Sequence, residues 1–138
     1  MTIMVDRATL LAKLDVGDIF HAQSPNGASL ICLVLSVGTS TIQARRVTTQ
    51  EDVEFDRRTG VKLGDDRAVP CMIDSVVALP SEIHNTFLEL DRKYRNLMAM
   101  DEKSRFEDLE RLKLTDAEKK ALLFISSHYP SNPLPPLA

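Results

Sequence analysis

The fold of this chain is decided by residues 18–37, which read DIFHAQSPNGASLICLVLSV. The pair Asn26-Gly27 favours a tight turn between two β-rich runs, because both residue types tolerate positive φ values. After the turn, apolar residues occupy both alternating faces of one strand: Ile31, Leu33, Leu35 and Val37 on one face, and Leu30, Cys32 and Val34 on the other. The stretch therefore predicts a hairpin whose second strand lies at the centre of a sheet and is covered on both sides.

Further strand-like runs follow this hairpin. They are separated by turns rich in glycine, serine and aspartate, and they cover residues 41–48, 53–56, 61–63 and 69–79. In the loop after the second of these runs, Gly60 stands where a residue with positive φ is expected. We therefore expect five or six short antiparallel strands over residues 17–79, curled into a small barrel.

The spacing of apolar residues becomes helical after Pro80. A long helix is predicted from residue 81, a second helix over 104–112, and a third from the capping-box pattern Thr115–Glu118 to about His128. A short helix is also expected over residues 6–14. We expect the helices to pack on the barrel, because the apolar face of Leu30, Cys32 and Val34 needs a cover.

The predicted fold class is therefore α+β. It consists of an antiparallel five- or six-stranded barrel, a short N-terminal helix and two or three C-terminal helices packed on the barrel. Residues 1–128 are expected to form a single globular domain, with the barrel at 17–79 and a helical extension at 81–128. Residues 129–138 contain four prolines and are expected to form an extended tail.

Composition and charge exclude several classes of protein. The chain has 138 residues, is 43% hydrophobic and carries a net charge of −3, which is spread evenly along its length. The longest apolar run covers residues 30–35, whereas a membrane span needs about 20 residues. Charged residues near the N-terminus interrupt any secretion signal, so we expect a cytoplasmic protein without a membrane partner. Cys32 and Cys71 are expected to be buried apolar residues and not a disulfide.

The opening of the predicted barrel carries a resemblance to a known fold. The segment Leu14-Asp15-Val16-Gly17-Asp18-Ile19-Phe20, in which a Gly-Asp pair precedes the first strand, resembles the start of many SH3-like small barrels. The resemblance covers roughly residues 14–79 and rests on the spacing of turns. It implies an SH3-like fold and carries over no functional residue.

The chain carries no common catalytic or cofactor motif. A nucleophile elbow, a phosphate-binding loop, a dinucleotide fingerprint and a His-Glu-x-x-His zinc pattern are all missing from the sequence. The three histidines are too widely spaced for a zinc module, and we expect His21 to be exposed on its strand. We therefore assign no catalytic residue, no cofactor and no metal ligand.

A cluster of basic residues near the third to fifth strands is the first candidate site. It comprises Arg45, Arg46, Arg57, Arg58, Lys62 and Arg67, and six acidic residues fall in the same part of the chain. One interpretation is cross-strand ion pairing on a solvated face. The other is a patch that binds an anion or a partner, because arginine binds phosphate and carboxylate through its planar fork.

The stripe Ile83, Phe87, Leu90, Tyr94 and Leu97 is the second candidate site. We name it the seam. A two-fold homodimer could bury it, with charged residues such as Asp91 at the rim, although intrachain packing is the alternative.

The expected function is a non-enzymatic module that binds a protein partner or a second copy of itself. One alternative is a nucleic-acid-binding protein that uses Arg45, Arg46, Arg57 and Arg58. The barrel region contains only two aromatic residues, Phe20 and Phe55, and both fall on apolar faces, which weakens that alternative. An enzyme of unidentified class is the other alternative.

Overall fold

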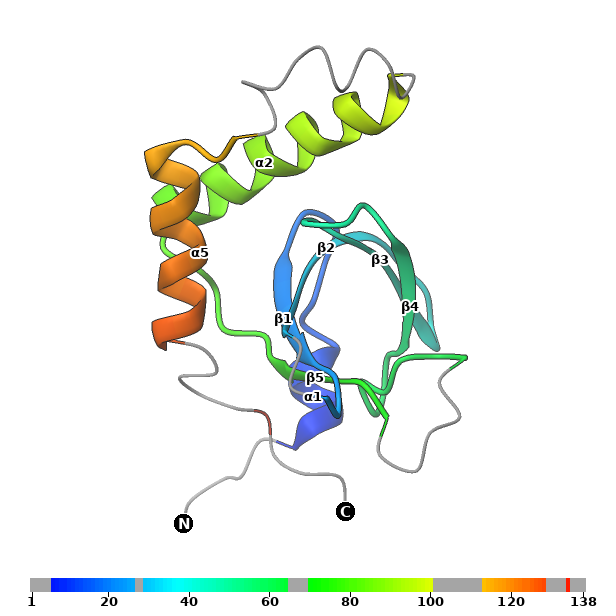
Figure 1. Cartoon of the computed structure of the whole chain (residues 1–138). Helices are drawn as coiled ribbons and strands as arrows, with labels where there is room; N and C mark the ends of the chain where they lie inside the picture. The colour runs from blue at the N-terminus through cyan, green and yellow to red at the C-terminus, as the bar shows by residue number, and fades with distance from the viewer. Residues whose placement is uncertain (1–5, 27–28, 65–69, 101–112, 129–133, 135–138) are drawn as a thin grey trace.

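The computed structural model describes residues 6–26, 29–64, 70–100, 113–128 and 134 (Figure 1). The described elements are, in order, α1 (Arg7–Leu11), β1 (Ile19–Gln23), β2 (Ser29–Val37), β3 (Thr41–Arg46), β4 (Asp52–Asp56), β5 (Met72–Ser75), α2 (Ser81–Ala99) and α5 (Asp116–His128). The chain is therefore α+β, with a curled antiparallel sheet, as the sequence predicts. The helix expected over 104–112 lies outside the described residues.

The five strands form one sheet in the order β4-β3-β2-β1-β5. β1 and β2 pair antiparallel from Ile19 opposite Leu33 to Gln23 opposite Ser29, which confirms the predicted hairpin. β3 pairs with the other side of β2, and a bulge there leaves Leu35 without a partner in the ladder. β2 is therefore central, and every strand pairing is antiparallel.

The segment after β4 bridges the two edges of the curled sheet. Lys62 stands opposite Phe55 of β4, and Val61 stands opposite Met72 of β5, each as an isolated bridge. The strand expected over 61–63 is reduced to these bridges because the chain turns away at Gly64. The expected strand 69–79 is likewise shorter, because residues 76–80 leave the sheet to reach α2.

The inner side of the curled sheet holds one hydrophobic core. Phe20 and Phe55 are both fully buried there, with ring centroids 5.2 Å apart and planes at 88°. This edge-to-face contact adds about 0.5–1.5 kcal/mol to the free energy gained by burying the rings. Cys32 and Cys71 belong to the same core and are buried, as the sequence predicts.

The outer side of β1 and β2 holds a second core under the helices. Ile31 and Leu33 of β2 pack there with residues of α2 and α5, which lie beside and above the sheet in Figure 1. The helices thus pack on the sheet as expected, but the expected face was wrong. Leu30, Cys32 and Val34 line the inner core, because the curl of the sheet covers that face without any help from α2 or α5.

Helix α5 is joined to α2 by a buried polar contact. The predicted capping box is present: the Glu118 backbone N–H donates to Thr115 Oγ1 at 3.1 Å, and the Thr115 N–H donates to Glu118 Oε1 at 3.0 Å. Lys93 Nζ of α2 donates to the same Oε1 at 2.8 Å. Burial alone would raise the pKa of Glu118, but the hydrogen bonds from Lys93 and Thr115 lower it overall.

No described helix has both the length and the apolar character that crossing a membrane requires.

Candidate partner-binding groove

Arg45, on the outer face of β3, is bound by helix α2. Its Nε donates to Oδ1 of Asp91 at 2.9 Å and its Nη2 donates to Oδ2 at 2.7 Å, while Gln50 Nε2 donates to Oδ1 at 2.9 Å. Burial alone would raise the pKa of Asp91, but these hydrogen bonds and the positive charge of Arg45 lower it overall. The forked edge of the Arg45 guanidinium is therefore occupied within the chain.

Arg57 makes contacts of a different kind at the start of the turn after β4. Its Nη1 donates to the carbonyl oxygen of Gly38 at 2.6 Å and its Nη2 to that of Ala12 at 3.1 Å. Arg57 thus ties the β2–β3 turn to the residues that follow α1. Its neighbour Arg58 is exposed, and both arginines line a shallow hollow of about 330 Å³ beside Ala8 and Thr39.

The structure separates the predicted basic residues into two groups. In the pairing of β3 with β4, Arg45 stands opposite Asp52 and Thr41 stands opposite Asp56, so Arg45 and Arg57 lie at opposite ends of this hairpin. Four strand residues span about 13 Å. Arg46 follows Arg45 at one end, Lys62 Nζ lies 3.8 Å from a Glu51 oxygen, and Arg67 is outside the described residues.

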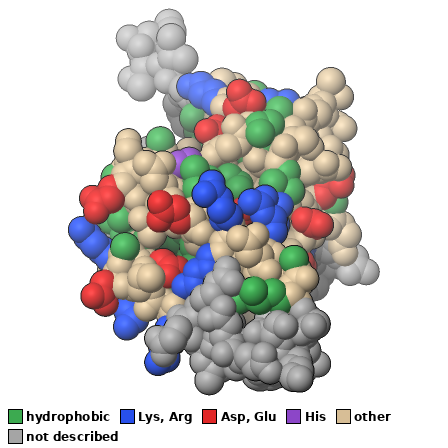
Figure 2. Space-filling model, turned by 90° about the horizontal axis from the view of Figure 1, so that it is seen from above, with side chains coloured by type: hydrophobic (Ala, Val, Ile, Leu, Met, Phe, Trp, Pro, Cys, Tyr) green, Lys and Arg blue, Asp and Glu red, His purple; other side chains and the backbone are tan. Residues whose placement is uncertain are grey.

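Charges of both signs also mix on the face of the molecule that Figure 2 shows from above. Figure 2 shows Lys and Arg side chains there beside Asp and Glu side chains, with hydrophobic side chains between them. Neither sign dominates this face, in keeping with the even distribution of charge along the sequence.

The seam on α2 is packed inside the chain. Ile83, Phe87 and Leu90 belong to the outer core, Leu97 is buried, and Tyr94 is partly buried against the same core. Asp91, which we expected at a charged rim of the seam, is 2% exposed. The seam is thus used by intrachain contacts, and a homodimer stays a prediction.

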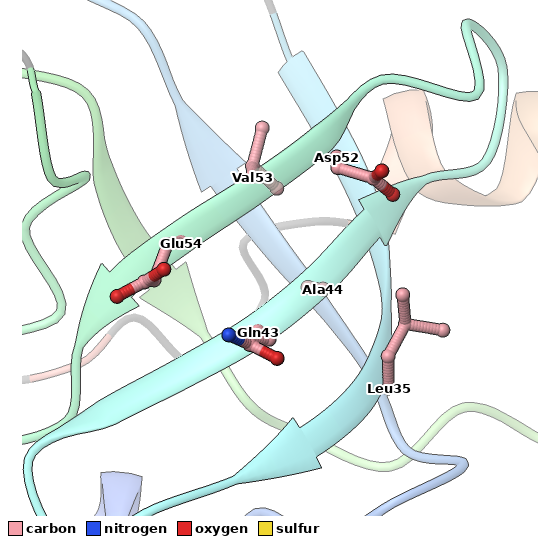
Figure 3. A pocket seen from close by; sticks show the side chains of 6 residues that line it. All are labelled: Leu35, Gln43, Ala44, Asp52, Val53 and Glu54. Atoms are coloured by element: carbon pink, nitrogen blue, oxygen red, sulfur yellow. The ribbon is translucent and has the colours of Figure 1, made fainter.

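A groove lies on the outer face of β3 and β4, over a part of the sheet beyond the outer core. It encloses about 320 Å³ and is lined by Leu35, Gln43, Ala44, Asp52, Val53 and Glu54 (Figure 3). Ala44 and Val53 belong to the inner core, so alternation along the strands places their main chain on the groove floor. Gln43 stands opposite Glu54, and their side chains project outward with that of Leu35.

The groove is acidic and its carboxylates are accessible. Asp52 is exposed and Glu54 is partly exposed, and neither forms an ion pair with a residue in the described ranges. Gln43 is exposed and its Oε1 accepts a hydrogen bond from Ser36 Oγ at 2.8 Å. The sequence analysis counted these acids only as partners of nearby arginines, because the alternation of strand residues does not show which outer positions helices leave uncovered.

A buried polar cluster at the opposite end of the sheet was also missed by the sequence analysis. We expected His21 to be exposed, but its exposed fraction is only 3%, and its Nδ1 contacts Asp74 Oδ1. Arg7 of α1 is buried nearby, where its Nε donates to the Thr59 carbonyl and its Nη2 to the Ile73 carbonyl. His21 is in phase with Ile19, and the carboxylate that makes its burial tolerable lies far along the sequence.

Within the described ranges, no three His, Cys, Asp or Glu side chains form a cluster that could hold a metal ion. Burial raises the pKa of the Cys32 thiol, which makes it a poor nucleophile. Comparison of the chain with protein-family models, curated proteins and solved structures gives no match.

Proposed function

We propose that this chain is a non-enzymatic interaction module built on an SH3-like barrel, and that the groove over β3 and β4 binds an extended basic segment of a partner protein. Short antiparallel strands that curl until residues 61–62 bridge both edges support the barrel assignment. The observation that carries the proposed function is the open groove itself, with two accessible carboxylates beside an apolar side chain.

The shape of the groove favours an extended ligand. Its floor is the main chain of two paired strands, and the outward side chains alternate along them, which matches the alternation of an extended peptide. Leu35 provides an apolar contact at β2, and Gln43 provides an amide for hydrogen bonding. A peptide bound in this way would place every second side chain in the groove.

The charge of the groove favours lysine or arginine in that ligand. A basic side chain would meet the carboxylates of Asp52 and Glu54, each exposed pair contributing about 0.2–1 kcal/mol. The same carboxylates repel phosphate, and the guanidinium groups of Arg45 and Arg57 already donate to groups of this chain. These observations favour a peptide over a nucleic acid.

The proposal is tested by titrating isotope-labelled full-length protein with a short peptide that alternates valine and arginine. We expect saturable amide shifts at Gln43, Asp52 and Glu54, and weak affinity, with a dissociation constant on the order of 100 μM. A peptide that alternates valine and glutamate should leave these amides unchanged.

A pair of double variants tests the role of the charges. Asp52→Asn with Glu54→Gln should weaken binding by about tenfold, which corresponds to the loss of two exposed ion pairs. Glu82→Gln with Glu89→Gln removes the same charge from exposed positions of α2 and should change the affinity little. Equal affinity of both double variants would contradict the proposal, as would a single-stranded oligonucleotide that shifts the groove amides when the basic peptide does not.

A further inference from the structure

One residue near the C-terminus is buried in the barrel. Leu134 is 8% exposed and belongs to the inner core, together with residues of all five strands. Its backbone N–H donates to the carbonyl oxygen of Asp74, in β5, at 2.8 Å. β5 is an edge strand of the sheet. On the side away from β1, the Ile73 N–H of β5 donates to the Gly60 carbonyl oxygen. Leu134, the one described residue after α5, is thus attached to the edge of the sheet.

The sequence around Leu134 makes this contact specific. Residues 133–136 read Pro-Leu-Pro-Pro, so Leu134 carries the only backbone N–H among these four residues. That N–H donates to the carbonyl oxygen of Asp74. A residue before proline also favours an extended backbone, which lowers the entropy that docking costs. Because the prolines on both sides lack a backbone N–H, Leu134 is the residue of this motif that can donate to the sheet, and its side chain supplies the apolar contact.

Asp74 connects this contact with the buried polar cluster. Its carbonyl oxygen accepts from Leu134, its Oδ1 contacts His21, and its Oδ2 is buried without a hydrogen-bond partner among the described residues. A buried acceptor without a partner is costly, so this corner of the molecule has unused capacity for a hydrogen-bond donor.

We propose that the position of Leu134 is a docking site for a leucine that is flanked by prolines in the sequence, and that Leu134 of this chain occupies the site in cis. Leu134 acts there as an anchor whose side chain completes the inner core. The short connection from the end of α5 to Leu134 gives the segment an effective concentration on the order of millimolar. A partner carrying the same kind of segment therefore binds only when the cis segment is displaced.

The test uses the full chain and a labelled synthetic peptide with the sequence of residues 129–138, YPSNPLPPLA. Fluorescence anisotropy should show binding to the Leu134→Asp protein about tenfold tighter than to the wild-type protein, in which the cis segment competes. The same peptide with aspartate at the leucine position should bind neither protein. Leu123→Asp places the same change on a residue of α5 that is 65% exposed, and this control should behave as wild type.

The proposal is overturned if the wild-type and Leu134→Asp proteins bind the peptide equally, or if the aspartate peptide binds as well as the leucine peptide. Sedimentation that shows a wild-type dimer and a Leu134→Asp monomer would place the segment in a second copy and would overturn the cis assignment.

Hydrogen exchange in the wild-type protein tests the docking of Leu134 without relying on the folding of any variant. The Leu134 amide should exchange its hydrogen at least about tenfold more slowly than the same amide in the free peptide, because it is donated to Asp74. Exchange as fast as in the free peptide would show that the segment is not docked and would refute the proposal.

Discussion

Two buried polar clusters join the helices to the sheet, and they differ in how fully their carboxylates are hydrogen-bonded. The upper cluster consists of Asp91, Arg45 and Gln50, and both oxygens of its carboxylate accept hydrogen bonds. The lower cluster consists of Asp74, His21 and Arg7, and one oxygen of its carboxylate has no hydrogen-bond partner among the described residues. In Figure 1, α2 and α1 mark the two ends of the molecule at which these clusters lie.

The difference shows which end of the molecule is structurally complete. A buried carboxylate that is bound by two donors holds α2 in place, and little remains for a ligand to gain there. The Asp74 side chain is 20% exposed, but its buried Oδ2 keeps hydrogen-bonding capacity, and its main-chain carbonyl oxygen accepts a hydrogen bond from Leu134. We therefore expect substitutions in the upper cluster to cost more stability than substitutions around the lower cluster.

Removing the carboxylate of the upper cluster should have the largest effect. Asp91→Ala leaves Arg45 and Gln50 without their shared acceptor, and we expect a loss of about 3 kcal/mol in the free energy of unfolding. Urea denaturation measures this loss. Arg92→Ala changes an exposed neighbour on the same helix and should cost no more than about 0.5 kcal/mol. A similar cost for both variants would mean that the upper cluster does not hold α2.

Displacing Arg7 should have the next largest effect. Gly60 has a φ of 76°, and a β carbon there would lie 2.7 Å from Arg7 Nη2 and 3.3 Å from Leu11 and Ile73 side-chain atoms. We expect Gly60→Ala to lower the midpoint of thermal unfolding and to cost about 2–3 kcal/mol.

Gly64→Ala is the matched control for Gly60→Ala. Gly64 has a φ of 80°, but a β carbon there meets no atom within 4 Å, so this variant carries only the backbone cost of about 1 kcal/mol. The difference between the two alanine variants measures the displacement of Arg7. If that difference is absent, Arg7 is not held against Gly60.

Acid should reduce the contribution of the upper cluster. The pKa of Asp91 lies below its ordinary value of 3.8, so the folded state favours the charged form. The resulting stability is present above that value and is lost as the pH falls through the lowered pKa. At neutral pH, Asp91→Asn should cost about 1–2 kcal/mol. In unfolding experiments the gap from wild type should narrow below 3.8, and a gap independent of pH would contradict the assignment.

A helix cap outside both clusters provides the smallest effect and a baseline. Thr115→Ala removes the side-chain acceptor for the Glu118 N–H and should cost about 1 kcal/mol. Thr115→Ser keeps a hydroxyl at the same position and should restore most of this loss. Circular dichroism during urea unfolding measures both variants, and an unchanged Thr115→Ala protein would show that the capping box contributes nothing to stability.

Local patterns in the sequence predicted the elements of the fold well. The hairpin of β1 and β2, the two apolar faces of β2 and the capping box each depend on residues within a few positions of one another. The assignment of each β2 face to a core was less successful. Alternation separates Leu33 from Val34, but the direction of the curl decides which of them meets the helices.

The polar contacts could not be predicted because their partners are far apart in the sequence. We expected Asp91 at the charged rim of the seam, but it is buried against Arg45, which lies 46 residues away in the sequence. Leu134 has no periodic neighbours, since prolines surround it. The groove depends on which strand positions the helices leave open, and that is a property of the tertiary structure.

The position of β5 in the sheet has a consequence for folding kinetics. The pairs β1–β2, β2–β3 and β3–β4 are formed by neighbouring strands, whereas Gln23 of β1 pairs with Met72 across most of the sequence that forms the sheet. Closing this long loop costs chain entropy that only later contacts repay. We therefore expect the three hairpins to form early and β5 to join last, bringing Asp74 to His21 in the same late step. We expect transient detachment of β5 to leave these three hairpins paired.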